Sequence, residues 1–60
     1  MRYELVDGKN GAILATSDKR SAVLDAASDF TGDLRLVKID ADGVRSEDTA
    51  GTKQLAKDGE

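Results

Sequence analysis

Residues 16–32, TSDKRSAVLDAASDFTG, have the pattern of a helix and connect two segments that have the pattern of strands. Five side chains recur at positions that share one side of a helical turn: Ala22, Val23, Ala26, Ala27 and Phe30. Polar residues occupy the opposite side, so the segment predicts an amphipathic helix that covers another element. We expect the two largest of the five, Val23 and Phe30, to supply most of the buried area of the helix.

The sequence also predicts where this helix begins and ends. Thr16 or Ser17 can accept a hydrogen bond from the free amides of a first turn, and Asp18 places negative charge near the positive end of the helix dipole. Gly32 supplies the left-handed conformation that closes many helices. Leu24 lies off the centre of the apolar side, so we expect it to be half exposed.

Before the helix, two short strands are predicted around a turn. Residues 2–6, RYELV, alternate between polar and apolar side chains, which is the period of a half-buried strand. Residues 7–11, DGKNG, predict a hairpin turn because Gly and Asn tolerate positive φ. Residues 12–16, AILAT, predict the second strand, in which either Ile13 or Leu14 faces the core.

The strongest strand pattern follows the helix, in residues 33–40, DLRLVKID. Leu34 and Leu36 share one face, whereas Val37 and Ile39 share the other. Either a bulge at Leu36 and Val37 brings all four to the core, or this is a central strand whose second face is also partly covered.

A second hairpin completes the predicted fold. Residues 40–43, DADG, predict a turn, and residues 44–47, VRSE, a short charged edge strand. The resulting order is ββαββ, an α+β fold with a four-stranded antiparallel sheet in the order 2-1-3-4 and one helix on one face. The alternative places the third strand parallel to the second.

The C-terminal residues 49–60 contain few apolar side chains, too few to offset the entropy of ordering them. We therefore expect a compact domain over residues 1–48 and a mobile tail over residues 49–60. The competing prediction is a short helix over residues 52–57 that docks Leu55, although short isolated helices are marginal in water.

Composition excludes most active-site chemistries. The 60 residues contain no Cys and no His, so thiolate sites and the commonest metal ligand and neutral-pH acid–base group are missing. We expect no enzymatic activity, no cofactor and no bound metal. The net charge of −3 disfavours broad nucleic-acid binding. No apolar run is long enough to cross a bilayer and no signal-peptide pattern is present, which indicates a cytoplasmic protein.

Two motifs have partial likeness to ligand loops. Residues 40–43 have the Asp spacing of a calcium loop but lack its first and last ligands. Residues 7–11 lack the Gly-Lys-Ser/Thr pattern of a phosphate loop and precede a strand instead of a helix. Both are better explained as turns.

Three arginines can share the uncovered face of the predicted sheet: Arg2, Arg35 and Arg45. They would form a basic stripe for nucleic acid, but RNA-binding sheets usually add exposed aromatic side chains, and the only Tyr is assigned to the core. The competing interpretation is that these arginines pair across strands with Glu4 and Glu47.

The sequence therefore predicts a small accessory or regulatory module without enzymatic activity. We expect it to bind another protein, including its own copy, through the open sheet face or an edge strand. The alternative is a nucleic-acid-binding adaptor that uses the basic stripe. The predicted partner-binding residues are Val6, Leu14, Arg35, Val37 and Arg45.

Overall fold

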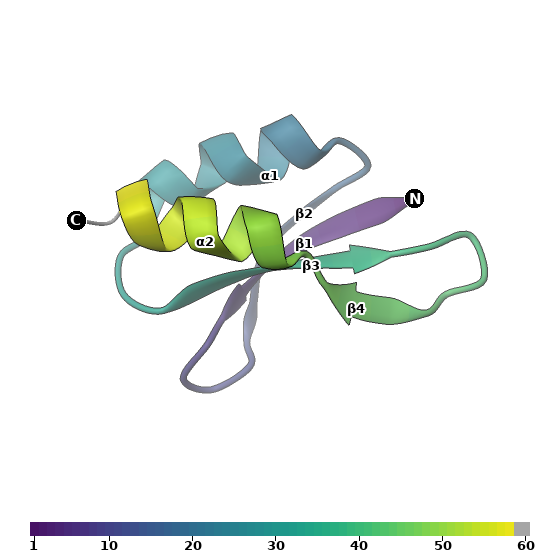
Figure 1. Ribbon diagram of the computed structural model, residues 1–60, viewed down its shortest axis with the longest axis horizontal. Helices are drawn as coiled ribbons and strands as arrows, with labels where there is room; N and C mark the ends of the chain where they lie inside the picture. The colour runs from purple at the N-terminus through teal and green to yellow at the C-terminus, as the bar shows by residue number, and fades with distance from the viewer. Residues whose placement is uncertain (59–60) are drawn as a thin grey trace.

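The computed structural model describes the backbone of residues 1–58 and the side chains of residues 1–55. The elements, in chain order, are β1 (Arg2–Asp7), β2 (Ile13–Ser17), α1 (Arg20–Ala26), the short 3₁₀ helix η1 (Ala27–Asp29), β3 (Leu34–Ile39), β4 (Arg45–Glu47) and α2 (Thr49–Asp58) (Figure 1). The chain is thus two consecutive units, each a β-hairpin followed by a helix.

The four strands form one antiparallel sheet in the order β2-β1-β3-β4, which confirms the predicted topology. A parallel pairing of the second and third strands is wrong, because β3 pairs with β1 and β4. Both helices lie on the same face of the sheet (Figure 1). Helix α1 contacts β1 and β2, and helix α2 contacts β3. The prediction of a single covering helix is therefore incomplete.

Both predicted turns are present. In the first, the Gly11 amide donates to the Asp7 carbonyl at 2.8 Å, and Gly11 adopts a φ of 75°. In the second, the Gly43 amide donates to the Asp40 carbonyl at 3.0 Å, and the Asp40 carboxylate accepts two further backbone amides. These bonds are those of Asx-type turns, so the acidic side chains are explained without a bound ion.

Strand β3 keeps a continuous register with β1, so it has no bulge at Leu36 and Val37. Leu36 lies opposite Leu5 in the core, whereas Val37 and Ile39 face the other side of the sheet. Of the two predicted alternatives, the central strand with a second, partly covered face is the one observed.

The irregularity lies elsewhere, between Leu5 and Val6 in the pairing of β1 with β2. Val6 pairs with Ile13, while Ala15 pairs with Leu5, and Leu14 packs against the core. A bulge of this kind places two neighbouring side chains where a regular strand would place one. It also answers the open question about the second strand, since Leu14 faces inward.

The core is small and contains side chains from both strands and helices. Leu5, Leu36 and Val23 are fully buried, and Ala27 and Leu55 complete the cluster. Burying a Val or Leu side chain stabilises a fold by about 1.5–3 kcal/mol. With so few large side chains in the core, each contributes a substantial share of the stability.

Helix α1 is shorter than predicted at both ends. Thr16 and Ser17 belong to β2, where they pair with Glu4 and Tyr3, and the helix begins at Arg20. No side chain caps its first turn; the Ser17 hydroxyl instead accepts the Lys19 amide in the preceding turn, at 3.1 Å. The predicted cap is therefore wrong. The predicted stop at Gly32 is also misplaced, because α1 ends at Ala26 and η1 at Asp29.

The buried side of α1 is rotated relative to the prediction. Val23 and Ala27 are buried, Leu24 packs against the core, and Ala22 is exposed. Phe30 follows η1 and is 36% exposed, so of the two residues expected to supply most of the buried area only Val23 is buried. Residues 20, 23, 24 and 27 have the i, i+3, i+4, i+7 spacing that fits this face.

The predicted tail is helical over the described part of its length. Helix α2 extends from Thr49 to Asp58, and Leu55 is only 7% exposed in the core. The competing prediction of a terminal helix that docks Leu55 is therefore confirmed, and the domain does not end at residue 48. Residues 59–60 of the predicted tail lie outside the described residues.

Helix α2 begins directly against the backbone of β3. The Asp48 amide donates to the Leu36 carbonyl at 2.8 Å, and the Leu36 amide donates to the Thr52 hydroxyl at 3.1 Å. At Gly51 any Cβ atom would overlap the Leu36 side chain, so only glycine permits this close approach.

Asp48 also caps α2 and connects it to α1. One carboxylate oxygen accepts the Gly51 amide at 3.0 Å, and the other accepts the Arg20 Nε at 2.9 Å. The Arg20 hydrogen bond, assisted by the Gly51 amide, lowers the pKa of the Asp48 carboxyl below its ordinary value.

Candidate functional site: the open sheet face

No described element covers the sheet face opposite the two helices. Side chains alternate between faces along each strand, and directly paired residues share a face. On this basis we define the open face by the following residues: Arg2, Glu4, Val6, Ile13, Thr16, Arg35, Val37, Ile39, Arg45 and Glu47.

Of the five predicted partner-binding residues, the structure brings together Val6, Arg35, Val37 and Arg45 on the open face. Leu14 does not join them, because it packs against the core on the helix side. Its inclusion was wrong because the bulge in the pairing of β1 with β2 changes which side chains of β2 face each way.

The centre of the open face is apolar and half-buried. Val6, Val37 and Ile39 are partly shielded although no helix lies over them. Ile13, paired with Val6 at the β2 end, remains 51% exposed. The open face therefore has two apolar pairs, Val6 with Ile13 and Val37 with Ile39, and the charged residues Glu4 and Arg35 lie between them.

An ion pair spans the sheet and crosses the β3 part of this surface. Arg45 Nη2 donates to the Glu4 carboxylate. Arg45 lies opposite Ile39, and Glu4 lies opposite Val37, so this contact reaches from β4 across β3 to β1, about two strand spacings of roughly 4.8 Å each. The aliphatic stem of Arg45 therefore runs over the apolar side chains of β3.

Glu4 is the most buried charged residue on the open face, with 9% of its surface exposed. A buried carboxylate needs a partner, because the desolvation cost of an unpaired charge is large. Its ion pair with Arg45 supplies that partner. This arrangement explains how an acidic residue can lie in the middle of an apolar surface.

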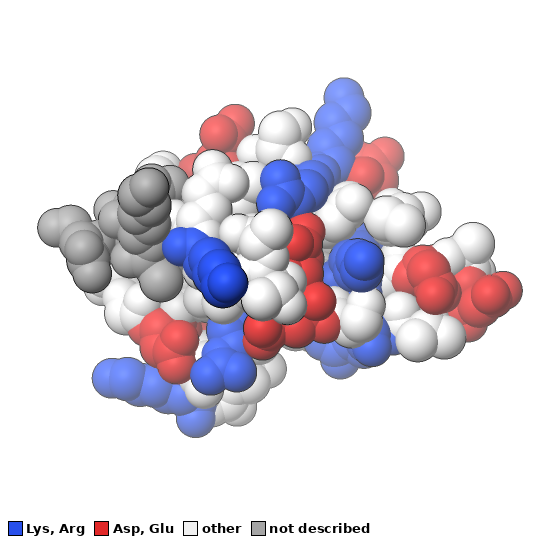
Figure 2. Space-filling model, viewed as in Figure 1, with Lys and Arg blue, Asp and Glu red and all other residues white. Residues whose placement is uncertain are grey.

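The other two arginines also have partners. Arg35 lies 3.6 Å from Glu47 and 3.7 Å from Asp33, and Arg2 donates to the Thr16 hydroxyl at 3.2 Å. The predicted cross-strand pairing with Glu4 and Glu47 is thus confirmed for Arg45 and Arg35, whereas Arg2 bonds to Thr16 instead. On the side shown in Figure 2, basic and acidic side chains are interspersed.

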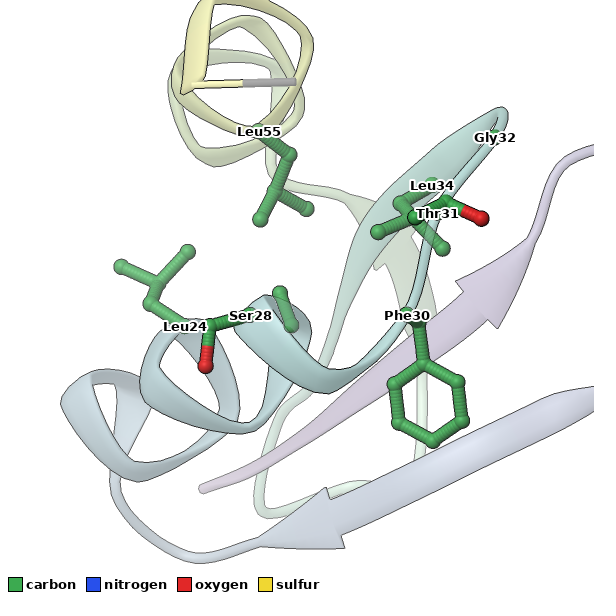
Figure 3. Close-up of a pocket in the computed structure, with 8 residues that line it drawn as sticks. Leu24, Ser28, Phe30, Thr31, Gly32, Leu34 and Leu55 are labelled. Atoms are coloured by element: carbon green, nitrogen blue, oxygen red, sulfur yellow. The ribbon is translucent and has the colours of Figure 1, made fainter.

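A groove lies between the helices, separate from the open face, and the sequence did not predict it. This groove of about 380 Å³ is lined by Leu24, Ala27, Ser28, Phe30, Thr31, Gly32, Leu34 and Leu55 (Figure 3). The lining residues come partly from α1 and partly from the C-terminal segment, which the sequence predicted to be a mobile tail. Only the docking of α2 brings Leu55 to Leu24.

The described residues lack a metal-binding cluster and a membrane-spanning helix. Among the residues that the structure describes, no three acidic side chains are close enough together to hold a metal ion. No helix within residues 1–58 is long and apolar enough to cross a membrane.

Comparisons of the chain with protein-family models, with curated proteins and with solved structures found no match.

Proposed function

We propose that this protein is a small accessory or regulatory module, without enzymatic activity, that binds another protein through the open face. The observation that supports the proposal is the set of apolar side chains on this uncovered face, Val6 with Ile13 and Val37 with Ile39, between which Glu4 and Arg35 lie. Contacts between proteins commonly combine apolar side chains with charged and polar ones in this way. A second copy of this chain is one such partner.

The absence of His and Cys from the sequence supports a binding role over a catalytic one. The polar groups of the open face are engaged with one another in ion pairs and hydrogen bonds instead of being aimed at a common point. A catalytic site needs an acid, base or nucleophile positioned against a substrate. We further propose that the protein acts in the cytoplasm.

The edges of the sheet could also bind another protein, by pairing with one of its strands. Strand β2 is at one edge of the sheet, and β4 at the other is only three residues long. An exposed edge can pair with a strand of another chain. The open face is the stronger candidate because it presents apolar side chains as well as backbone groups.

Nucleic-acid binding has less support. Arg2, Arg35 and Arg45 each have a partner within the protein, so phosphate would compete with existing ion pairs and hydrogen bonds. The open face contains no aromatic side chain on which bases could stack. The adaptor function is therefore an outcome that the following experiment can detect.

The test compares two substitutions of exposed, β-branched residues. Ile13→Thr reduces the apolar surface of the open face, whereas Val44→Thr makes a similar change at a residue outside it that is 59% exposed. We expect Ile13→Thr to weaken self-association in sedimentation, or capture of a protein from the native cell, by roughly fivefold to tenfold. Val44→Thr should leave both unchanged, and added salt should have little effect.

If Ile13→Thr and Val44→Thr associate or capture protein to the same extent, the open face is not the binding surface. If the protein stays monomeric at high concentration and captures no protein, but retains nucleic acid that salt and Arg35→Ala release, the adaptor function replaces our proposal.

A further inference from the structure

The groove between the helices exists because each helix rests on different strands. Helix α1 lies over β1 and β2, and helix α2 over β3, so the helices pack on the sheet more than on each other. Leu24 and Leu55 point toward one another across the space, and Leu34 lies on its β3 side (Figure 3). Ala27 and Gly32 also line the groove. Ala27 has only a methyl group and Gly32 has no side chain, so neither fills the space.

The chemistry of the lining restricts what can bind. Its apolar part is made by Leu24, Leu34 and Leu55 together with Ala27, and no charged side chain is among the described lining residues. A charged ligand would lose its hydration without a compensating ion pair. The groove volume of about 380 Å³ falls within the range of about 300–1,000 Å³ that is usual for small-molecule sites.

The lining also includes two exposed residues with hydroxyls, Ser28 and Thr31, which lie apart from one another (Figure 3). Ser28 donates its hydroxyl proton to the Asp25 carbonyl at 2.9 Å, and in Figure 3 its oxygen points away from Leu55. The hydroxyls therefore lie at the margin of the groove, and the leucines make its apolar interior.

We propose that the groove between α1 and α2 binds an uncharged small molecule whose apolar part packs among Leu24, Leu34 and Leu55. This site is separate from the open face, which is on the opposite side of the sheet, and the inference does not depend on the proposed protein-binding function.

The test uses N-phenyl-1-naphthylamine, an uncharged aromatic dye with one N–H group whose fluorescence rises in apolar surroundings. We expect saturable binding of one dye per chain. Ser28→Leu places a larger side chain in the groove and should weaken binding by at least about tenfold. Ser21→Leu is the matched control, because Ser21 is exposed on α1 but is not part of the groove lining.

Methyl resonances of the wild-type protein provide a second readout that does not depend on the variants folding. Dye should shift the methyl signals of Leu24, Leu34 and Leu55 and leave those of Val6 and Val37 in place. The proposal is overturned if the dye does not saturate, if Ser28→Leu and Ser21→Leu bind it equally, or if the shifts appear on the open face instead.

Discussion

Asp48 joins three elements, using a different atom for each. Its amide donates to β3 at Leu36, one carboxylate oxygen caps α2 at Gly51, and the other accepts the Arg20 Nε from α1. A side-chain cap of this kind stabilises a helix by about 1 kcal/mol. Because Arg20 is partly exposed, its ion pair adds no more than about 1 kcal/mol.

Because the pKa of Asp48 is lowered in the folded protein, acid should weaken the contacts that Asp48 makes. The pKa lies below its ordinary value of 3.8, first because of Arg20 and then because of the Gly51 amide. The unfolded chain therefore takes up the proton at a higher pH than the folded protein does. The stabilisation is complete above the ordinary value and is lost as the pH falls through the lower, folded value.

We therefore predict how Asp48→Asn changes the acid dependence of stability. Asn still caps the helix, so at neutral pH the variant should lose only the Arg20 contribution, about 1 kcal/mol or less. In acid the free energy of unfolding of the wild type should fall toward that of the variant, and the difference should close. Urea unfolding at a series of pH values measures both curves. A difference that stayed constant into acid would contradict the Asp48–Arg20 contact.

At the scale of elements, α2 shows how far local sequence can mislead. Its segment is poor in apolar residues and has Gly51 near its start, both of which argue against an isolated helix. In the structure the helix is held by tertiary contacts: two hydrogen bonds to the backbone of Leu36 and the burial of Leu55. No local pattern contains that information.

We predict that Leu55 contributes more to stability than Phe30 does. Leu55 is buried in the core cluster, so Leu55→Ala should cost about 2–4 kcal/mol. Phe30 is partly exposed and its ring points away from the groove (Figure 3), so Phe30→Ala should cost only about 1 kcal/mol, well below the value expected for the main buried residue of a helix. Urea unfolding midpoints rank the two, and the reverse order would mean that α2 is not docked as described.

The strands could be predicted from sequence because their signals are local. Alternation of side chains put Leu36 and Val37 on opposite faces of the strand, and the turn residues located both hairpins. Four of the five predicted partner-binding residues lie on the open face. Leu14 was misplaced because the bulge near Val6 depends on how two backbones pair, which the sequence of β2 alone does not encode.

At the scale of the whole molecule, the Arg45–Glu4 pair connects the two hairpin–helix units. Arg45 belongs to β4 of the second unit and Glu4 to β1 of the first. A chain of this length has a total stability of roughly 3–9 kcal/mol. A single contact between the units can therefore be a noticeable part of the whole.

We predict that the arginines of the open face differ in their effect on stability. Arg45→Ala should cost about 1–3 kcal/mol, because it leaves the Glu4 carboxylate shielded from water without its partner and uncovers Val37 and Ile39. Arg35→Ala removes a pair in which both sides are about half exposed, so it should change stability by less than about 0.5 kcal/mol. Denaturant unfolding of the two variants at moderate salt makes the comparison, and similar losses would argue against the bridging role of Arg45.

The close approach of Gly51 to Leu36 also has a kinetic consequence. Helix α2 is weak on its own, and the backbone groups that hold its first turn are in place only after β3 has formed. We therefore expect α2 to join late in folding and to leave early in unfolding. In stopped-flow measurements, Leu55→Ala should speed unfolding and leave the refolding rate nearly unchanged. A matched slowing of refolding would show that α2 docks earlier. On the expected route the chain opens from its C-terminal end, and Leu55 and Leu36 are the first core residues to meet water.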